Sequence, residues 1–127
     1  MEFPEELYYT QDHEWLRLEG DDAYIGITAF AADQLGDIVF IDIPQTPLIE
    51  AGTVFGTIEA VKTVSDLFAP VSGGMLYVNP DVLAYPELVN SDPYGRGWLV
   101  KLVITAAAEP GSLLTSEQYQ KMTGHGS

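Results

Sequence analysis

The stretch IEAVKTVSDLFAPVSGG, residues 58–74, contains parts of two β-like segments with almost nothing between them. The first segment is TVFGTIEAV at 53–61 and the second is TVSDLFAPV at 63–71. Both are rich in the β-branched and aromatic residues that favour strands. Lys62 is the only residue that separates them. We therefore expect a tight β-hairpin with Lys62 at its tip.

A second hairpin and a short helix are expected upstream. Residues 14–19 (EWLRLE) alternate in polarity, and residues 23–27 (AYIGI) resume the β pattern after a Gly-Asp-Asp turn. Thr28 then precedes AFAADQL, a run of good helix formers that Gly36 closes. The sequence therefore predicts a hairpin followed by a short helix, with Thr28 as its N-cap and Gly36 as its left-handed terminator.

Strands and loops alternate through the rest of the chain. DIVFIDI at 37–43 is strongly β-like, and two prolines follow it. We expect Gly73 and Gly74 to form a turn into the next strand, MLYVN. Residues 80–97 are rich in Pro, Gly, Asn and Asp, which predicts a loop with one helical turn. WLVKLVI at 98–104 predicts the last strand.

The C-terminal part predicts one more helix. Thr115 precedes SEQYQKM, and Gln118 has the spacing of a capping box. Residues 123–127 carry no structural signal, so we expect an unstructured end there. Many short strands between Gly and Pro turns favour a mainly β sandwich or partly open barrel with short peripheral helices. Because no linker divides the chain, we expect one domain over residues 1–127.

Charge and composition exclude several classes of function. Nineteen acidic residues against five basic ones give a formal net charge of −14. Five scattered basic residues cannot form a phosphate-binding footprint, so we expect no nucleic acid ligand. Any partner that uses electrostatics should present a positive surface. The chain has no cysteine, which excludes disulfides, thiolate metal sites and a cysteine nucleophile. Its apolar runs are short and interrupted and its first residues do not resemble a signal peptide, so we expect a soluble protein.

Lys62 has two interpretations. A solvated lysine commonly occupies a turn, where its charge discourages edge pairing. However, a hairpin held by apolar residues also offers a fixed point from which an unbranched side chain projects, and its amine can be acylated. That is the geometry required by a covalent cofactor arm, so an arm-bearing lysine is the alternative to a plain turn residue.

The sequence EAVKTVSDLFAPVSG around Lys62 closely resembles the modification hairpin of the glycine cleavage system H proteins, a family of lipoyl carriers. Four further blocks resemble the family in its usual order, YYTQDHEWLRLEGDDAYIGIT, LGDIVFIDIP, PELVNSDPYGRGW and LLTSEQYQKM, so the resemblance covers about residues 5–122. It implies a barrel-sandwich hybrid of two small antiparallel sheets with added helices, and lipoate in amide linkage on Lys62. Biotin carriers typically place methionine on both sides of the modified lysine, where this chain has Val61 and Thr63.

The resemblance implies carriage, with little catalysis by the protein itself. In the family, a lipoyl-lysine arm shuttles the aminomethyl group of glycine among a pyridoxal-phosphate-dependent glycine decarboxylase, a tetrahydrofolate-dependent aminomethyltransferase and dihydrolipoyl dehydrogenase. A lipoyl ligase or transferase attaches the arm, and we expect a monomer. Tethering gives each visit a high effective concentration of the transferred group. The sequence is compatible with the bacterial cytoplasm and with the mitochondrial matrix.

The resemblance also implies a surface cleft that receives the loaded arm. Polar groups near the HEW block and the aspartate four residues after the lysine hold the amine in the family, which points here to Glu14 and Asp66, with Asp12 as a looser candidate. Attraction between a cationic amine and carboxylates strengthens as water is excluded. Each carboxylate could instead bind nearby backbone N–H groups. We assign His13 no role, because a histidine beside a tryptophan at a strand start is more often structural.

Two other functions are compatible with the sequence. An H-like lipoate protein could serve another pathway, such as sulfur oxidation or a relay of lipoyl groups. An unmodified interaction module, with Lys62 as a turn residue, predicts no added mass when lipoate and a lipoyl ligase are supplied. An independent enzyme is not expected, because no Ser or Cys nucleophile motif and no metal-ligand spacing accompanies the polar residues near His13 and Asp66.

Overall fold

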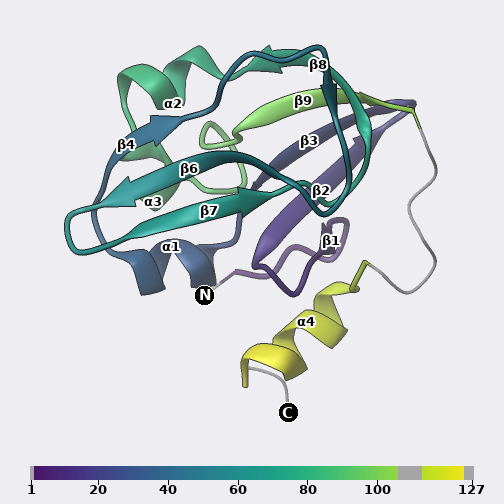
Figure 1. Ribbon diagram of the computed structural model, residues 1–127. Coiled ribbons are helices and arrows are strands. Elements are labelled where there is room, and N and C mark those ends of the chain that lie inside the picture. Colours follow the sequence, from purple (N-terminus) through teal and green to yellow (C-terminus); the bar gives the residue numbers. More distant parts are fainter. Residues whose placement is uncertain (1, 106–112, 125–127) are drawn as a thin grey trace.

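The computed structural model describes residues 2–105 and 113–124 (Figure 1). Within these residues the strands are β1 (Tyr8–Tyr9), β2 (Glu14–Glu19), β3 (Asp22–Ile27), β4 (Ile38–Asp42), β5 (Leu48–Ile49), β6 (Val54–Ala60), β7 (Val64–Phe68), β8 (Gly73–Val78) and β9 (Val100–Ile104). The helices are α1 (Ala29–Leu35), α2 (Pro80–Ala84), α3 (Leu88–Ser91) and α4 (Ser116–Thr123). No helix in these two ranges is long and apolar enough to cross a membrane.

The strands form two antiparallel sheets, which confirms the predicted mainly β fold with short peripheral helices. The larger sheet has the order β1-β2-β3-β9-β8-β5, and the smaller has the order β4-β6-β7 (Figure 1). One hydrophobic cluster takes buried side chains from both sheets, among them Leu16, Ile25 and Leu102 from the larger and Ile58 and Leu67 from the smaller. The sheets therefore enclose a common core, and burial of apolar area contributes roughly 25 cal/mol per Å².

Helix α1 follows the β2–β3 hairpin as the sequence predicts, but its end differs. The hydroxyl of Thr28 accepts a hydrogen bond of 3.1 Å from the N–H of Ala31, so Thr28 is the N-cap. Gly36 has φ 79° and ψ −154°, which is not the predicted left-handed helical conformation. The chain turns there directly into extended backbone leading to β4, and the side-chain amide of Asn90 donates to the Gly36 carbonyl at 2.8 Å. A positive φ still favours glycine at this position.

Gly73 and Gly74 lie inside β8, so the prediction of a turn at these residues is wrong. They pair with Ile104 and Val103 of β9. A Cβ atom added to Gly73 would lie 2.5 Å from the carbonyl oxygen of Val103. The glycine is thus needed for close approach of two backbones, a role that the sequence does not distinguish from a turn.

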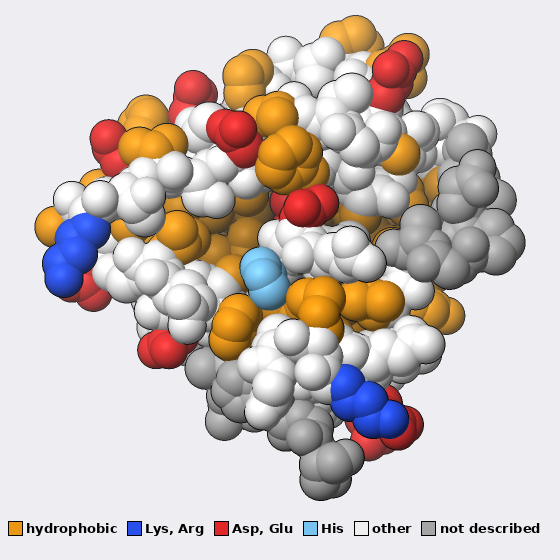
Figure 2. Space-filling model, turned by 60° about the horizontal axis from the view of Figure 1, so that its bottom comes forward, with side chains coloured by type: hydrophobic (Ala, Val, Ile, Leu, Met, Phe, Trp, Pro, Cys, Tyr) orange, Lys and Arg blue, Asp and Glu red, His pale blue; other side chains and the backbone are white. Residues whose placement is uncertain are grey.

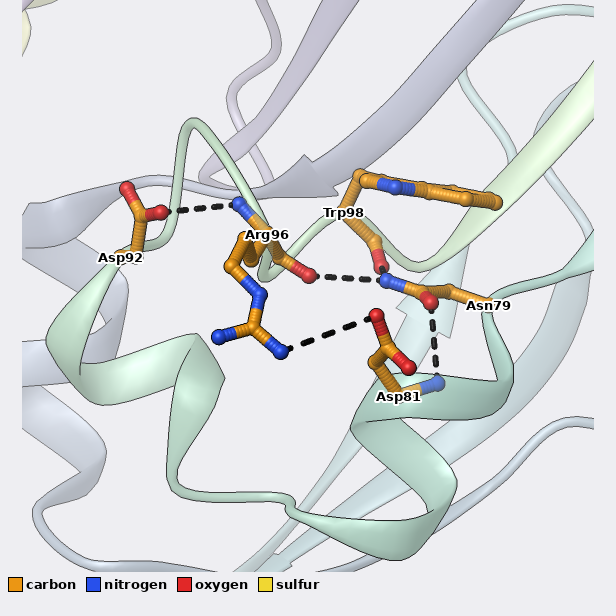
Figure 3. A network of polar contacts seen from close by, with 5 residues as sticks. All are labelled: Asn79, Asp81, Asp92, Arg96 and Trp98. Atoms are coloured by element: carbon orange, nitrogen blue, oxygen red, sulfur yellow. Dashed lines mark hydrogen bonds and ion pairs between the residues drawn. The ribbon is translucent and has the colours of Figure 1, made fainter.

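The segment between β8 and β9 contains two short helices where one helical turn was expected. Asn79 accepts from the N–H of Asp81 at 3.0 Å and so caps α2. Its buried amide also donates to the carbonyls of Arg96 and Trp98 at 2.8 and 2.7 Å (Figure 3). Asp92 accepts from the N–H of Arg96 at 2.9 Å. These contacts join the two ends of the segment, and they stabilise helices too short to be indicated by residue pattern alone.

Helix α4 closes the described part of the chain against the N-terminal strand. Thr115 and Gln118 form the predicted capping box, with bonds of 3.2 and 2.9 Å. The ring of Tyr119 stacks on Tyr9 of β1, with centroids 4.8 Å apart. The helix includes Thr123, and Gly124 ends it in the left-handed conformation. The remainder of the expected unstructured end, residues 125–127, lies outside the described residues.

Candidate functional site

The hairpin that carries Lys62 projects from the smaller sheet. Figure 1 shows the turn between β6 and β7 at the left edge of the molecule. The N–H of Ala60 donates to the carbonyl of Thr63 at 2.7 Å, which closes the turn around Val61 and Lys62. Three residues, 61–63, thus lie outside the strands, where the sequence predicted Lys62 alone. Lys62 lies at the tip of the hairpin, as predicted.

Two sets of hydrogen bonds fix the base of this turn. The N–H of Val61 donates to the carbonyl of Asp37 at 3.0 Å. Asn90 of α3 holds the residues on both sides of Asp37, because its side chain accepts from the N–H of Ile38 at 3.0 Å and donates to the carbonyl of Gly36 at 2.8 Å. The residue that precedes Lys62 is therefore tied to the body of the protein, while the Lys62 side chain is exposed.

Lys62 differs from the other basic residues in its lack of an ionic partner. The four others form ion pairs with acidic side chains at 3.3–3.9 Å, namely Arg17–Glu19, Lys101–Asp22, Lys121–Glu117 and Arg96–Asp81, the last drawn in Figure 3. No acidic side chain among residues 2–105 and 113–124 lies within ion-pair distance of the Lys62 amine. The amine is thus free to be modified.

A cleft of about 420 Å³ lies beside the hairpin strands. One part of its wall is apolar, formed by Ile27, Phe30, Leu35, Ile58 and Leu67. The other part is polar, formed by Asp12, His13, Glu14, Gln34, Ser65 and Asp66. In Figure 2, hydrophobic side chains line a hollow whose edge carries a histidine. The three carboxylates singled out in the sequence are therefore brought together in one cleft.

Glu14 is the most deeply buried of these carboxylates, with 1% of its surface exposed. Its Oε2 accepts from the N–H of Phe68 at 2.7 Å, whereas Oε1 has no hydrogen-bond partner in the described part of the chain. Burial raises the pKa of Glu14 to about 8, against the lowering effect of the Phe68 N–H, and the charge of Asp12 raises it further. A cation that enters the cleft would favour the ionised form and pair with Oε1.

Asp66 and Asp12 are exposed at the rim of the same cleft. Asp66 of β7 lies opposite Thr57 in the β6–β7 register, four residues after Lys62 in the sequence. Its carboxylate accepts no hydrogen bond from a backbone N–H of any described residue, unlike that of Glu14. The alternative that Asp66 binds nearby backbone N–H groups is therefore not seen in the described residues. The described residues contain no group of three His, Asp or Glu side chains able to hold a metal ion.

The sequence did not assign His13 and Gln34 to this cleft. His13 has a left-handed backbone, with φ 67°, and its ring lies 5.1 Å from that of Phe30. The contribution of α1 follows a helical pattern, since Phe30 and Gln34 are four residues apart, as are Ala31 and Leu35. Side chains at that spacing share one face of a helix, so this pattern was a signal in the sequence that could have been used.

The chain is similar to known proteins over nearly its full length. The sequence pattern of the family described as glycine cleavage H-protein matches residues 7–126. A glycine cleavage system H protein from Bacteroides fragilis is 57% identical over 121 residues, covering 94% of this chain and 96% of that protein. One from Magnetococcus marinus is 53% identical over 120 residues, covering 94% and 86%.

A solved structure agrees in fold as well. The crystal structure of a glycine cleavage system H protein from Mycobacterium marinum matches with a TM-score of 0.87 and 40% sequence identity, covering 95% of this chain and 98% of that one. The resemblance first seen in the sequence blocks is confirmed. The chain therefore belongs to the glycine cleavage H-protein family, the non-catalytic carriers of the glycine cleavage system, in which lipoate is bound covalently to a lysine.

Proposed function

We propose that Lys62 is the lysine of this chain that carries lipoate, in amide linkage to its side-chain amine. The observation that supports this most directly is the isolation of that amine, which is exposed at the tip of an anchored hairpin and has no ionic partner among the described residues. Lys101 and Lys121 are both engaged in ion pairs, at 3.6 and 3.5 Å.

The cleft fits an arm attached at Lys62. The strands β6 and β7, which hold the lysine, also contribute Ile58, Ser65, Asp66 and Leu67 to its wall. Four residues of extended strand span roughly 13 Å. A lysine side chain lengthened by lipoate can therefore reach from the tip of the hairpin into the cleft.

The cleft also fits the chemistry that the family carries. When bound, lipoate supplies a strained disulfide that opens to hold the aminomethyl group of glycine and is afterwards reoxidised. Glu14, with its unpaired Oε1, would bind the cationic amine of that cargo, and Asp66 and Asp12 would add negative charge at the rim. The apolar side chains in the lining would lower the polarity around a bound arm, which would strengthen these attractions.

The carrier would exchange its cargo with the decarboxylase, the aminomethyltransferase and dihydrolipoyl dehydrogenase of the system, after a lipoyl ligase or transferase has attached the arm. We place it in the bacterial cytoplasm, since the relatives described above are bacterial. It would act as a monomer. The hydrophobic cluster that both sheets share supports a single domain.

Mass spectrometry tests the attachment site. The chain is incubated with lipoate, ATP and a lipoyl ligase, and its intact mass and peptides are compared with those of the Lys62→Arg variant and of a Lys101→Arg control. One lipoyl amide on Lys62 in the wild type and in the control, and none in Lys62→Arg, is expected. Modification of Lys101 or Lys121 instead would overturn the assignment, and no modification at all would favour an unmodified interaction module.

A further inference from the structure

A chain of side-chain hydrogen bonds links the C-terminal helix to the wall of the cleft. The hydroxyl of Tyr119 lies 2.8 Å from Nδ1 of His13 and 2.7 Å from Oγ1 of Thr28. Thr28 and Tyr119 have no exposed surface, whereas His13 is half-buried and lines the cleft. Tyr119 is 106 residues from His13 in sequence, so only the fold creates this contact.

Thr28 and Tyr119 each have a single hydroxyl hydrogen, and this determines which group donates in each of these hydrogen bonds. Oγ1 of Thr28 already accepts from the N–H of Ala31 at 3.1 Å. Its own hydroxyl hydrogen has only the Tyr119 oxygen as an acceptor among the described residues. If Tyr119 donated to Thr28 instead, that buried hydrogen would have no partner, which is unfavourable. Thr28 therefore donates to Tyr119, and the single hydroxyl hydrogen of Tyr119 is left for His13.

We infer that Tyr119 is a positioning residue, which donates to Nδ1 of His13 and thereby holds the imidazole neutral, with its proton on Nε2. No described residue bonds to Nε2, so this N–H is available to the cleft. Protonation of His13 would place a second hydrogen between Nδ1 and the tyrosine oxygen. The series of hydrogen bonds would then have to reverse, with His13 donating to Tyr119 and Tyr119 donating to Thr28. The hydroxyl hydrogen of Thr28 would be left unpaired.

The surroundings of His13 support a fixed ring. His13 is the only non-glycine residue with positive φ in the described ranges, and such a conformation persists only where neighbours hold it. Its N–H donates to the carbonyl of Thr10 at 3.1 Å, and its carbonyl accepts from the N–H of Thr28 at 3.0 Å. The rings of Phe30 and Tyr119 both lie near the His13 ring, with centroids at 5.1 and 5.7 Å.

The ionisable groups around His13 are consistent with a neutral ring. Burial lowers the pKa of His13, and the negative charge of Asp12 raises it to a lesser extent. Glu14 follows His13 directly as the first residue of β2, and Asp66 of β7 lines the same cleft. Burial raises the pKa of Tyr119 to about 12, which keeps its hydroxyl protonated and able to donate.

The consequence concerns the charge of the cleft and rests on the function proposed above. An imidazolium beside Glu14 would pair with its carboxylate and repel a cationic cargo. A neutral His13 leaves the carboxylates of Glu14 and Asp66 for that cargo and adds one N–H donor for an acceptor atom. Tyr119, which does not line the cleft, would thus keep a competing positive charge out of it.

NMR of the ¹⁵N-labelled full chain without lipoate tests the inference, so its outcome does not depend on whether Lys62 is the attachment site. His125→Gln assigns the ring signals of the two histidines. At neutral pH, Nδ1 of His13 should give the signal of an unprotonated nitrogen and Nε2 that of a protonated one. A proton on Nδ1 would overturn the inference without any further variant.

Variants separate positioning from simple packing. In Tyr119→Phe, His13 should become a mixture of tautomers and its pKa should rise toward about 6.5. Thr28→Ser keeps the hydroxyl and should keep the wild-type signals, whereas Thr28→Val should not. Tyr77→Phe, at an exposed tyrosine, is the control. An unchanged tautomer and pKa in Tyr119→Phe would refute the role of Tyr119.

Discussion

The hairpin tip and the cleft each hold an ionisable side chain with an unpaired atom, but in opposite surroundings. Lys62 is exposed, and water solvates its ammonium group at little cost. Glu14 is buried, and its Oε1 has no hydrogen-bond partner in the described part of the chain. The Lys62 amine is therefore available because it is exposed, whereas the Glu14 carboxyl group attracts cations because it is buried and one of its oxygens is unpaired.

This difference separates attachment from retention. An attachment point must reach other proteins, so it gains from exposure and from a backbone that does not move away. A retention site must compete with water for its ligand, so it gains from burial. The two sites share the strands β6 and β7, and variants on each side should break one property and leave the other.

The largest effect is expected at the tip. Lys62→Arg keeps a positive charge but removes the primary amine, so glycine cleavage reconstituted with the other components should fall to background. The free energy of unfolding should change by less than about 0.5 kcal/mol, because the side chain is exposed. Urea unfolding together with the activity assay checks both parts. Activity above background in this variant would show that Lys62 is not the lysine that carries lipoate.

Glu14→Gln should change the pH dependence of stability. The pKa of Glu14 in the fold is about 8, above its ordinary value of 4.5, so the folded state binds the extra proton between these values. The wild type should therefore lose stability relative to the variant as pH rises from 4.5 to 8, by roughly 1.4 kcal/mol per pH unit. Urea unfolding of both proteins across this range gives the difference, and parallel curves would contradict it.

Asn90→Ala tests the anchoring of the tip. It removes the two side-chain bonds to Gly36 and Ile38, and the loss should be about 1–3 kcal/mol of unfolding free energy. The amide of Val61, which donates to Asp37, should then exchange with solvent at least about fivefold faster. Gln45→Ala, at an exposed position, is the control. Unchanged exchange at Val61 would show that the tip is held independently of Asn90.

The smallest effect is expected for Asp66→Asn. Asp66 is exposed, so its attraction for a cationic cargo should be worth no more than about 1 kcal/mol, or a fivefold change in affinity. The aminomethylated carrier should retain its cargo slightly less well, and the difference should vanish at high salt. Asp33→Asn, on an exposed part of α1, is the control. A loss of affinity much greater than fivefold would mean that Asp66 becomes buried when the arm is in the cleft.

Local patterns in the sequence predicted much of the fold. The Lys62 hairpin, the Thr28 N-cap and the Thr115–Gln118 capping box depend on residues a few positions apart, and all three are present. The conformation of Gly36 and the strand position of Gly73 depend instead on distant partners, Asn90 and Val103. Glycine pairs signal both turns and close backbone approach, so the sequence alone does not separate the two.

The cleft shows the same limit. The three carboxylates were named from a resemblance, and the structure brings Asp12, Glu14 and Asp66 together. The burial of Glu14 and its bond to Phe68, 54 residues away, could not be predicted, because both depend on how the two sheets pack. The contact of His13 with Tyr119 joins the two ends of the chain and likewise has no local signature.

The unpaired Oε1 of Glu14 makes the folding stability of the carrier a measure of what the cleft contains. Any cation that binds this atom in the folded state alone raises the melting temperature, in proportion to the logarithm of its concentration relative to its dissociation constant. The same free energy opposes release. An enzyme that removes a cation from this cleft must therefore offset the stability that the fold gains by holding it.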